Sequence, residues 1–232
     1  DQTEDDKNKA YIYVHVGLIK DEQGKYEEAL TFYEQSLAIN QKTLSPNDPE
    51  LAKSYGNIGI VHRHMGNYPK ALSYYEKALE IQQQSLPSNH PDLAISYNNI
   101  GLVHYSMGNY PKALSSHEKA LEIRQQSLPP NHPDLAKSYN NIGSLHASMR
   151  NFPKALSYFE KALQIDQQSL PPNHPDLAMS YNNIGLVHNN MSNYPKARTF
   201  FERAIQIGEQ SLSSNHPDLQ GYRNNFERVK NK

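Results

Sequence analysis

One repeat period dominates this sequence and restricts the folds open to it. The pentapeptide Asn-Tyr-Pro-Lys-Ala starts at Asn67 and Asn109, occurs with Phe for Tyr at Asn151, and starts again at Asn193, in steps of 42 residues. Residues 91–132 are identical to the following 42 residues at 32 of 42 positions. Periods of about 20–50 residues are typical of arrays in which each unit packs against its neighbours. We therefore interpret the chain as a tandem repeat array.

A second motif with the same step places the repeat boundaries. Asn-His-Pro-Asp starts at Asn89, Asn131, Asn173 and Asn215, with the variant Asn-Asp-Pro-Glu one step earlier. We predict one array over residues 1–232, with repeats at 7–48, 49–90, 91–132, 133–174 and 175–216 and a capping helix at 217–232.

Proline indicates two helices in each repeat. No proline interrupts an apolar-periodic segment, and two of its registers, those of Pro69 and Pro91, suit helix starts, where a missing N–H does no harm. Asn109 and its equivalents are predicted to cap the second helix. Gly108 suits the left-handed turn after the first helix, but Arg150 and Ser192 take that place later, which leaves the turn open there. The prediction is an all-α solenoid of helix-turn-helix units with about 11 helices.

Composition excludes several classes of function. The chain has 23 Lys plus Arg against 24 Asp plus Glu, so no electrostatic argument favours nucleic acid or an anionic membrane as a partner. It has no Cys, and no stretch approaches the ~18 apolar residues that a membrane helix needs. We expect a cytoplasmic protein with no disulfide, no nucleic-acid partner and no membrane partner.

The repeat resembles a known family. The spacing of Tyr97, Ile100, Gly101, Ala113 and Ala120 is similar to the signature of tetratricopeptide repeats (TPRs). The 42-residue step, with Tyr-Asn-Asn-Ile-Gly, Ala-Leu-Glu-Ile and His-Pro-Asp-Leu-Ala, resembles the kinesin light chain type. That resemblance implies a right-handed superhelix whose first helices line a concave groove for extended peptides.

Helical geometry predicts an asparagine ladder in that groove. At 100° per residue, the first helix of the third repeat places Asn99 on the arc opposite the stripe of Tyr97 and Ile100. The ladder comprises Asn57, Asn99, Asn141, Asn183 and Asn225. A carboxamide can pair with both the N–H and the C=O groups of an extended peptide, and the resemblance implies that use. Alternatively, duplication copied the residues and each bonds to a neighbouring helix, which suits Asn98, Asn140, Asn182 and Asn224 on the flank better.

Apolar side chains also lie on this arc. They are Leu18, Ile60, Leu102 and Leu186. An exposed apolar row is typical of an interaction site. The alternative is that adjacent first helices cover these side chains.

The remaining groove candidates differ from repeat to repeat. Lys53, Arg63 and His64 make the second repeat basic, Tyr105 gives the third another character, and Lys137 adds charge in the fourth. Variation on a repeated frame suits ligand selection. We predict ligands with acidic residues placed against Lys53, Arg63 and Lys137.

Histidine is frequent, but its spacing does not indicate a metal site. Eight of the 11 histidines are copies one period apart, and no His-Glu-x-x-His spacing occurs. No glycine loop suits phosphate, and no base accompanies the Ser hydroxyls. We expect no enzyme activity, no catalytic residue, no metal and no cofactor.

The preferred hypothesis is a protein–protein interaction module that binds an extended peptide segment of a partner in its concave groove through the Asn ladder. Two alternatives stay open. The chain is a passive spacer or self-assembling scaffold that stacks end to end, or it is a regulatory or targeting TPR segment of a larger multidomain enzyme or signalling protein. We expect a monomer unless the stacking alternative holds.

Overall fold

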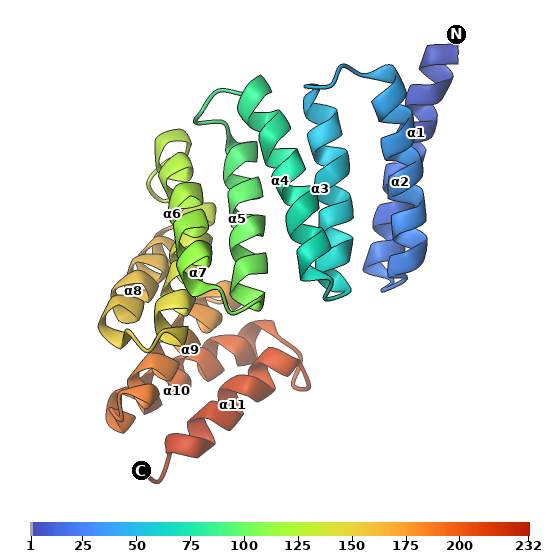
Figure 1. Cartoon of the computed structure of the whole chain (residues 1–232). Helices are drawn as coiled ribbons and strands as arrows, with labels where there is room; N and C mark the ends of the chain where they lie inside the picture. The colour runs from blue at the N-terminus through green and yellow to red at the C-terminus, as the bar shows by residue number, and fades with distance from the viewer. Residues whose placement is uncertain (1) are drawn as a thin grey trace. The chain divides into compact units, whose positions relative to one another are not determined.

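The structure, a computed structural model, describes residues 2–232, with side chains from Glu4 on; residue 1 of the predicted 1–232 array lies outside the described residues. These residues form eleven α-helices (Figure 1). Their bounds are α1 Gln2–Glu22, α2 Tyr26–Thr43, α3 Pro49–His64, α4 Tyr68–Ser85, α5 Pro91–Ser106, α6 Tyr110–Ser127, α7 Pro133–Ser148, α8 Phe152–Ser169, α9 Pro175–Asn190, α10 Tyr194–Ser211 and α11 Pro217–Val229. The predicted all-α class is confirmed.

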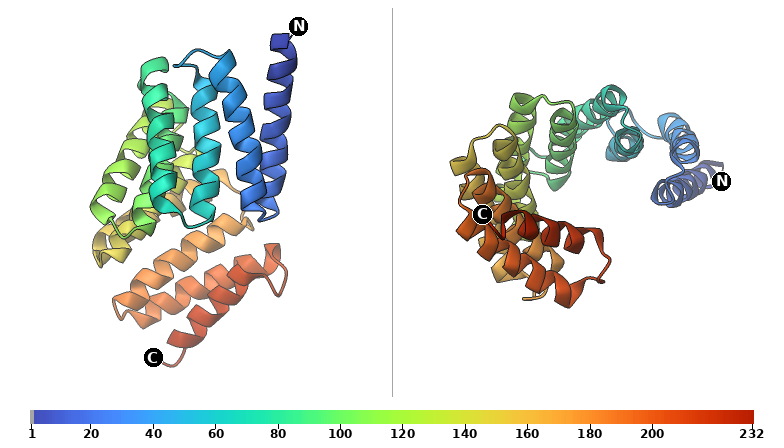
Figure 2. Two further views of the ribbon diagram at one scale, coloured as in Figure 1. Left: turned by 45° about the vertical axis from the view of Figure 1, so that its right-hand side comes forward. Right: turned by 90° about the horizontal axis from the view of Figure 1, so that it is seen from below.

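Helices pair with their neighbours along the chain, as a solenoid of helical hairpins requires. Contacts join α1 to α2, α3 to α4, α7 to α8 and α9 to α10, and α11 packs on α9 and α10. The chain forms two compact units, one up to Ile123 and one from Arg124. Within the first unit the hairpins α1–α2 and α3–α4 stand side by side (Figure 2).

Small apolar clusters between adjacent hairpins form the core. In the first unit, Tyr33 of α2 packs with Ile58 and Val61 of α3. In the second, Phe159 of α8 packs with Ile184 of α9. Each large side chain buried in this way contributes about 1.5–3 kcal/mol. Repeats are therefore stabilised chiefly by their neighbours, which explains how a thin apolar composition folds.

The left-handed turn after the first helix occurs in every repeat. Gly66 and Gly108 have φ of +73°, and the same turn occurs at Arg150 with φ of +60° and at Ser192 with φ of +59°. The turn that the sequence left open is thus retained without glycine. A non-glycine residue in this region costs roughly 1–2 kcal/mol, so packing of the two helices holds it there.

The asparagine cap predicted for the second helix is wrong at two positions. Asn67 and Asn151 precede α4 and α8 but accept no hydrogen bond through their side chains. The residue two positions on is proline, which has no N–H to offer. Asn193 reaches only the next N–H, that of Lys196, at 3.4 Å.

The first helices have caps that the sequence interpretation missed. Asp48 Oδ1 accepts the N–H of Glu50 at 2.9 Å at the start of α3. In later repeats a histidine replaces this Asp, and its Nδ1 accepts the N–H two residues on at 3.1–3.3 Å. These are His90, His132, His174 and His216. The copies therefore have a role, and it requires the neutral imidazole.

The first helix extends beyond the repeat period at its start. Helix α1 begins at Gln2, ahead of Lys7, where the 42-residue step predicts the start of the first repeat. The first repeat has Lys7 where later repeats have a helix-starting proline, so nothing fixes the start there. Glu4 and Asp5 in the first turn also favour the extra turn, because they face the positive end of the helix dipole.

Candidate functional site

A hollow of about 370 Å³ lies on the first unit, lined mainly by residues of α3 and α5, with one residue each of α1 and α2 and two of α4 completing the lining. It brings together four of the predicted site residues, Lys53, Asn57, Ile60 and Asn99, and their neighbour Ile95. Apolar side chains make up much of its lining, and the two carboxamides stand one repeat apart. We call it the α1–α3–α5 hollow.

The five asparagines of the ladder fall into two groups. Among the described residues, the side chains of Asn57, Asn99 and Asn183 have no hydrogen-bond partner, and all three are half-buried. Asn141 makes an interaction inside the protein. Asn225 Nδ2 donates to Asn182 Oδ1 at 3.0 Å. The carboxamides at 57, 99 and 183 are therefore free to pair with another chain, whereas that of Asn225 is in part committed.

Two of the flanking asparagines, Asn140 and Asn182, are packed at least in part, whereas Asn224 is exposed. Asn182 is 9% exposed and accepts the bond from Asn225. The Oδ1 atom of Asn140 is enclosed by the protein. Asn140 and Asn182 therefore contribute to helix packing and are poorly placed to contact a ligand.

The apolar row is partly covered by neighbouring helices. Ile60 packs against the cluster that contains Tyr75 and Ile100, and Leu186 packs against the cluster that contains Phe201. Leu102 is half-buried, and Leu18 in α1 is 47% exposed. The alternative of partial coverage therefore applies to Ile60 and Leu186.

Arg63 and His64 do not form a free basic edge. His64 Nδ1 lies 2.8 Å from Asp21 Oδ1, and Arg63 Nη2 lies 3.1 Å from His64 Nε2. Because arginine can only donate, Nε2 of His64 accepts and its Nδ1–H donates to Asp21. The Asp21 side chain is only 9% exposed. This network joins α3 to α1, so the two residues hold the repeats together.

The other charged and aromatic candidates stay exposed. Lys53 pairs with Glu50, and Lys137 Nζ lies 3.2 Å from Asp134 Oδ1. Such exposed pairs contribute about 0–1 kcal/mol, so a ligand can replace either partner. The Tyr105 ring is 38% exposed and lies 5.8 Å from another tyrosine ring.

One further set of residues was missed. In the second helices α2, α4, α6 and α8, one position near the end contacts a serine 14 residues on, in the next repeat; the equivalent residues of α10 and α11 are Gly208 and Tyr222. The pairs are Asn40–Ser54, Gln82–Ser96, Arg124–Ser138 and Asp166–Ser180, at 2.6–3.0 Å. Asn40 and Gln82 also line the α1–α3–α5 hollow. Their signal in the sequence is that this position differs in every repeat, while the serine is the same in the second to fifth repeats.

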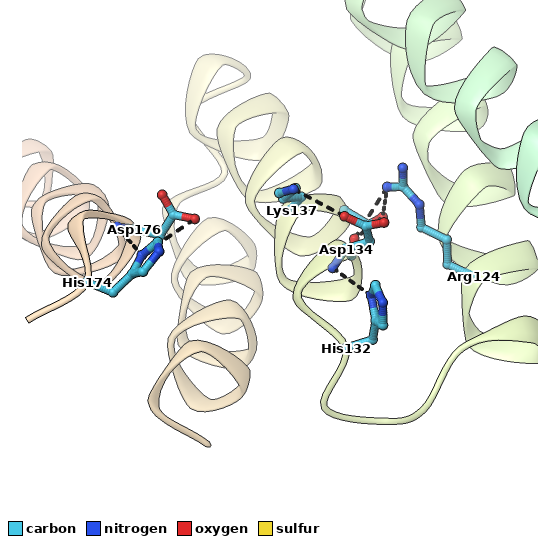
Figure 3. A network of polar contacts seen from close by, with 7 residues as sticks. Arg124, His132, Asp134, Lys137, His174 and Asp176 are labelled. Atoms are coloured by element: carbon cyan, nitrogen blue, oxygen red, sulfur yellow. Dashed lines mark hydrogen bonds and ion pairs between the residues drawn. The ribbon is translucent and has the colours of Figure 1, made fainter. Parts of the chain in front are cut away.

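The Arg124 junction shows how such a pair is built (Figure 3). Arg124 Nη1 donates to Ser138 Oγ at 2.6 Å and to the backbone oxygen of Asp134 at 3.3 Å. Lys137 approaches Asp134 from the other side, and His132 caps the same helix (Figure 3). Burial lowers the pKa of Arg124, yet its guanidinium keeps these polar partners. The junction is polar and specific to this pair of repeats.

The buried histidines are structural. Burial lowers the pKa of His62, His104 and His188 below the usual 6.5, and a nearby lysine lowers each further. These side chains are therefore neutral at pH 7. Among the described residues, no group of three or more His, Asp or Glu side chains gathers as a metal site would require.

Comparison with known proteins identifies the repeat. The sequence matches the tetratricopeptide repeat family over residues 8–84, 50–126, 92–168 and 134–210. The chain belongs to the tetratricopeptide repeat family. This TPR fold is a protein-interaction fold. No curated protein sequence matches the chain.

Solved structures similar to this TPR chain include kinesin light chain-like proteins. BtubC (BKLC) from P. vanneervenii is 23% identical, with a TM-score of 0.79, over 92% of this chain and 90% of that one. A kinesin light chain-type protein of Podosopora anserina with nearly identical TPR-like repeats is 20% identical, with a TM-score of 0.75, over 88% and 97%. RapI in its apo form is 19% identical, with a TM-score of 0.77, over 96% and 83%. At these identities the likeness concerns the fold alone, and it agrees with the kinesin light chain type predicted from the 42-residue step.

The length and apolar content of the described helices can be compared with those of membrane-spanning helices. None of those in residues 2–232 is long and apolar enough to cross a bilayer.

Proposed function

We propose that this TPR chain binds an extended peptide segment of a partner protein, and that the α1–α3–α5 hollow is one part of the binding surface. The observation that carries the proposal is the pair Asn57 and Asn99. Both line the hollow, and neither has a side-chain partner inside the protein. A half-buried carboxamide without a partner leaves hydrogen-bonding capacity unused, which a peptide backbone can satisfy.

The hollow also suggests how a ligand side chain is held. Ile60 and Ile95 offer apolar surface, and Ile95 is 51% exposed. An apolar side chain of the peptide placed here removes both from water, at about 25 cal/mol per Å² of apolar area. The two asparagines then fix the peptide backbone on either side of it.

The predicted acidity of the ligand has less support in this hollow. Glu50 and Asp92 line it together with Lys53, so two carboxylates accompany one ammonium group. An acidic residue must displace Glu50 from Lys53 before it can pair there. The preference for acidic ligands stays a prediction, which peptides with and without acidic residues will test.

The test uses peptides selected from a random twelve-residue phage library on the wild-type chain. The double variant N57A/N99A is expected to weaken the selected peptide about tenfold or more, because each lost hydrogen bond contributes about 0.5–1.5 kcal/mol. Its melting temperature should not change, because no internal bond is lost. N89A/N131A, at exposed loop positions, is the matched control and should bind like the wild type.

Three outcomes count against the proposal. If N57A/N99A and the wild type bind the selected peptide with equal affinity, the two carboxamides do not contribute to binding. A lower melting temperature of N57A/N99A shows that the two asparagines stabilise the fold instead of binding a ligand. Failure to select any peptide, together with light scattering that increases with concentration, favours the self-assembling scaffold.

A further inference from the structure

One repeat lacks a ring that its counterparts have. In the second helix of the repeat, four of the five repeats carry an aromatic side chain at one position, and the third carries serine. The series is Phe32, Tyr74, Ser116, Tyr158 and Phe200. The other four rings show what this position normally holds.

The fourth repeat defines the surroundings of the ring. Tyr158 stacks on His146, with centroids 5.5 Å apart and planes at 14°. It lies 6.2 Å from Tyr139, tilted by 35°. The ammonium group of Lys161 stands 5.5 Å from its centroid. A tyrosine, a histidine and a cation thus frame one aromatic ring.

The second repeat has the same frame with the same dimensions. Tyr74 stacks on His62 at 5.4 Å, lies 6.2 Å from Tyr55, and has Lys77 Nζ 5.6 Å from its centroid. Because two repeats agree so closely, the frame is a property of the repeat and not of one local sequence.

The third repeat keeps the frame and lacks the ring. Tyr97, His104 and Lys119 occupy the three framing positions. The hydroxyl of Ser116 donates to the backbone oxygen of Lys112 at 3.0 Å. Lys119, which has no ring on its own helix to cover, pairs instead with Glu122 at 2.8 Å.

A hollow of about 430 Å³ opens at this place, lined by Tyr97, Ser116, Lys119 and Glu122. A hollow of about 480 Å³ occupies the equivalent place in the fifth repeat, but there the ring of Phe200 lines it. The third repeat is therefore the one where the lining side chain is small and polar instead of aromatic.

We propose that Tyr97, Ser116 and Lys119 form a binding site for one aromatic side chain, phenyl or phenol, supplied by a partner protein. The incoming ring takes the place that corresponds to Tyr158 of the fourth repeat and lies against the tyrosine and the lysine of the frame, whereas His104 is buried and does not line the hollow. Ring–ring contact contributes about 0.5–1.5 kcal/mol, and an exposed cation over a ring adds about 0.5–1 kcal/mol. Releasing Lys119 from Glu122 costs little, because the pair is exposed.

The charges at the site favour a neutral ring over an anion. Glu118 and Glu122 line the hollow beside Lys119, so two carboxylates accompany one cation. A carboxylate or phosphate ligand meets net repulsion there, whereas the ring quadrupole is attracted by the ammonium group alone. This site is separate from the α1–α3–α5 hollow, and it does not depend on the function proposed for that hollow.

The test uses one substitution that fills the site with a tyrosine ring and another that creates an equivalent site in the fourth repeat. The probe is N-acetyl-4-fluorophenylalanine amide, followed by fluorine NMR. Wild type should bind one equivalent. S116Y, which installs the side chain of the second and fourth repeats, should weaken binding at least tenfold. Y158S, which creates the third-repeat arrangement in the fourth, should bind a second equivalent.

Two controls separate the site from unspecific adsorption. Q126Y adds a ring at an exposed position of the same helix, α6, that does not line the hollow, and should bind the probe like the wild type. N-acetyl-leucine amide, which is apolar but not aromatic, should not displace the probe.

Melting temperatures complete the test. S116Y should fold and melt higher than the wild type, because the frame is already present. If S116Y melts higher but binds the probe unchanged, or if the leucine compound competes equally, the proposal is overturned.

Discussion

The third and fourth repeats, residues 91–132 and 133–174, share 32 of 42 residues, and they differ most in what fills the space between their two helices. Their helices have equal lengths, 16 residues for α5 and α7 and 18 for α6 and α8. Yet Ser116 and His117 of the third repeat stand where the fourth has Tyr158 and Phe159. The backbone of the repeat thus tolerates different packing between the helices, because the shared prolines, small residues and caps already determine its path. Function can then vary at the packing positions.

The largest expected effect concerns the buried ring of the fourth repeat. Phe159 is 3% exposed, and a Cβ added at Gly143 would lie 2.8 Å from its Cδ1 atom. F159A should lower the free energy of unfolding by about 3–5 kcal/mol, because it leaves a cavity against a backbone that cannot collapse. The measurement is equilibrium unfolding in urea.

The matched change in the third repeat makes the comparison quantitative. H117A should cost less than F159A, because an imidazole ring buries less apolar area than a phenyl ring. H117F, which installs the residue of the fourth repeat, should stabilise the chain. If H117A and F159A lower the free energy of unfolding equally, the packing between the helices does not differ between the two repeats.

A smaller effect is expected at the turn between the helices. Gly108 in the third repeat and Arg150 in the fourth have φ of +73° and +60°. R150G should raise the free energy of unfolding by about 1 kcal/mol, because glycine has no Cβ to strain this conformation. G108A should lower it by a similar amount, and calorimetry of both variants checks the pair. If R150G destabilises the chain, the arginine side chain contributes more than its backbone costs.

The smallest effect separates the two repeat junctions by pH. Burial raises the pKa of Asp166 above its usual 3.8, against the opposing hydrogen bond from Ser180. A raised pKa in the folded state means that stability is fully present below the unfolded pKa of about 3.8 and is lost as pH rises through the folded pKa. D166N should therefore stabilise the chain at pH 7, and its advantage should shrink as pH falls toward 3.8.

The control for this pH effect comes from the second repeat. Q82E places a carboxyl at the equivalent junction position, where Gln82 is also buried and contacts Ser96. The free energy of unfolding of Q82E should depend on pH in the same way as that of the wild-type chain does through Asp166. If the difference in the free energy of unfolding between D166N and wild type does not change with pH, Asp166 is ionised in the folded chain at no cost in stability.

Local features were well predicted from the sequence. Helices α3, α5, α7, α9 and α11 begin at prolines, and the left-handed turn lies at Gly24, Gly66 and Gly108, because a proline ring or a missing Cβ acts within its own residue. The caps were predicted less well. A histidine replaces the familiar aspartate ahead of α5, α7, α9 and α11. The proline two residues after Asn67 and Asn151 has no N–H for the asparagine side chain to accept.

Side-chain partners across repeats could not be predicted. The sequence placed Arg63 and His64 on a basic edge, but Asp21, 43 residues away from His64, binds that imidazole. The sequence placed five asparagines in one ladder, but Asn225 donates to Asn182, also 43 residues away. A helical wheel gives the direction of a side chain from its own axis and contains no information about what the next helix brings there.

By itself, the sequence determined the repeat, its two helices, their ends and the TPR family, because these depend on residue types at short and regular spacing. Only the tertiary structure decided which carboxamides remain free, which charges are neutralised and where an aromatic ring is missing from its frame. Those properties depend on side chains from different repeats meeting within about 3 to 6 Å, and small differences between nearly identical repeats decide what they meet.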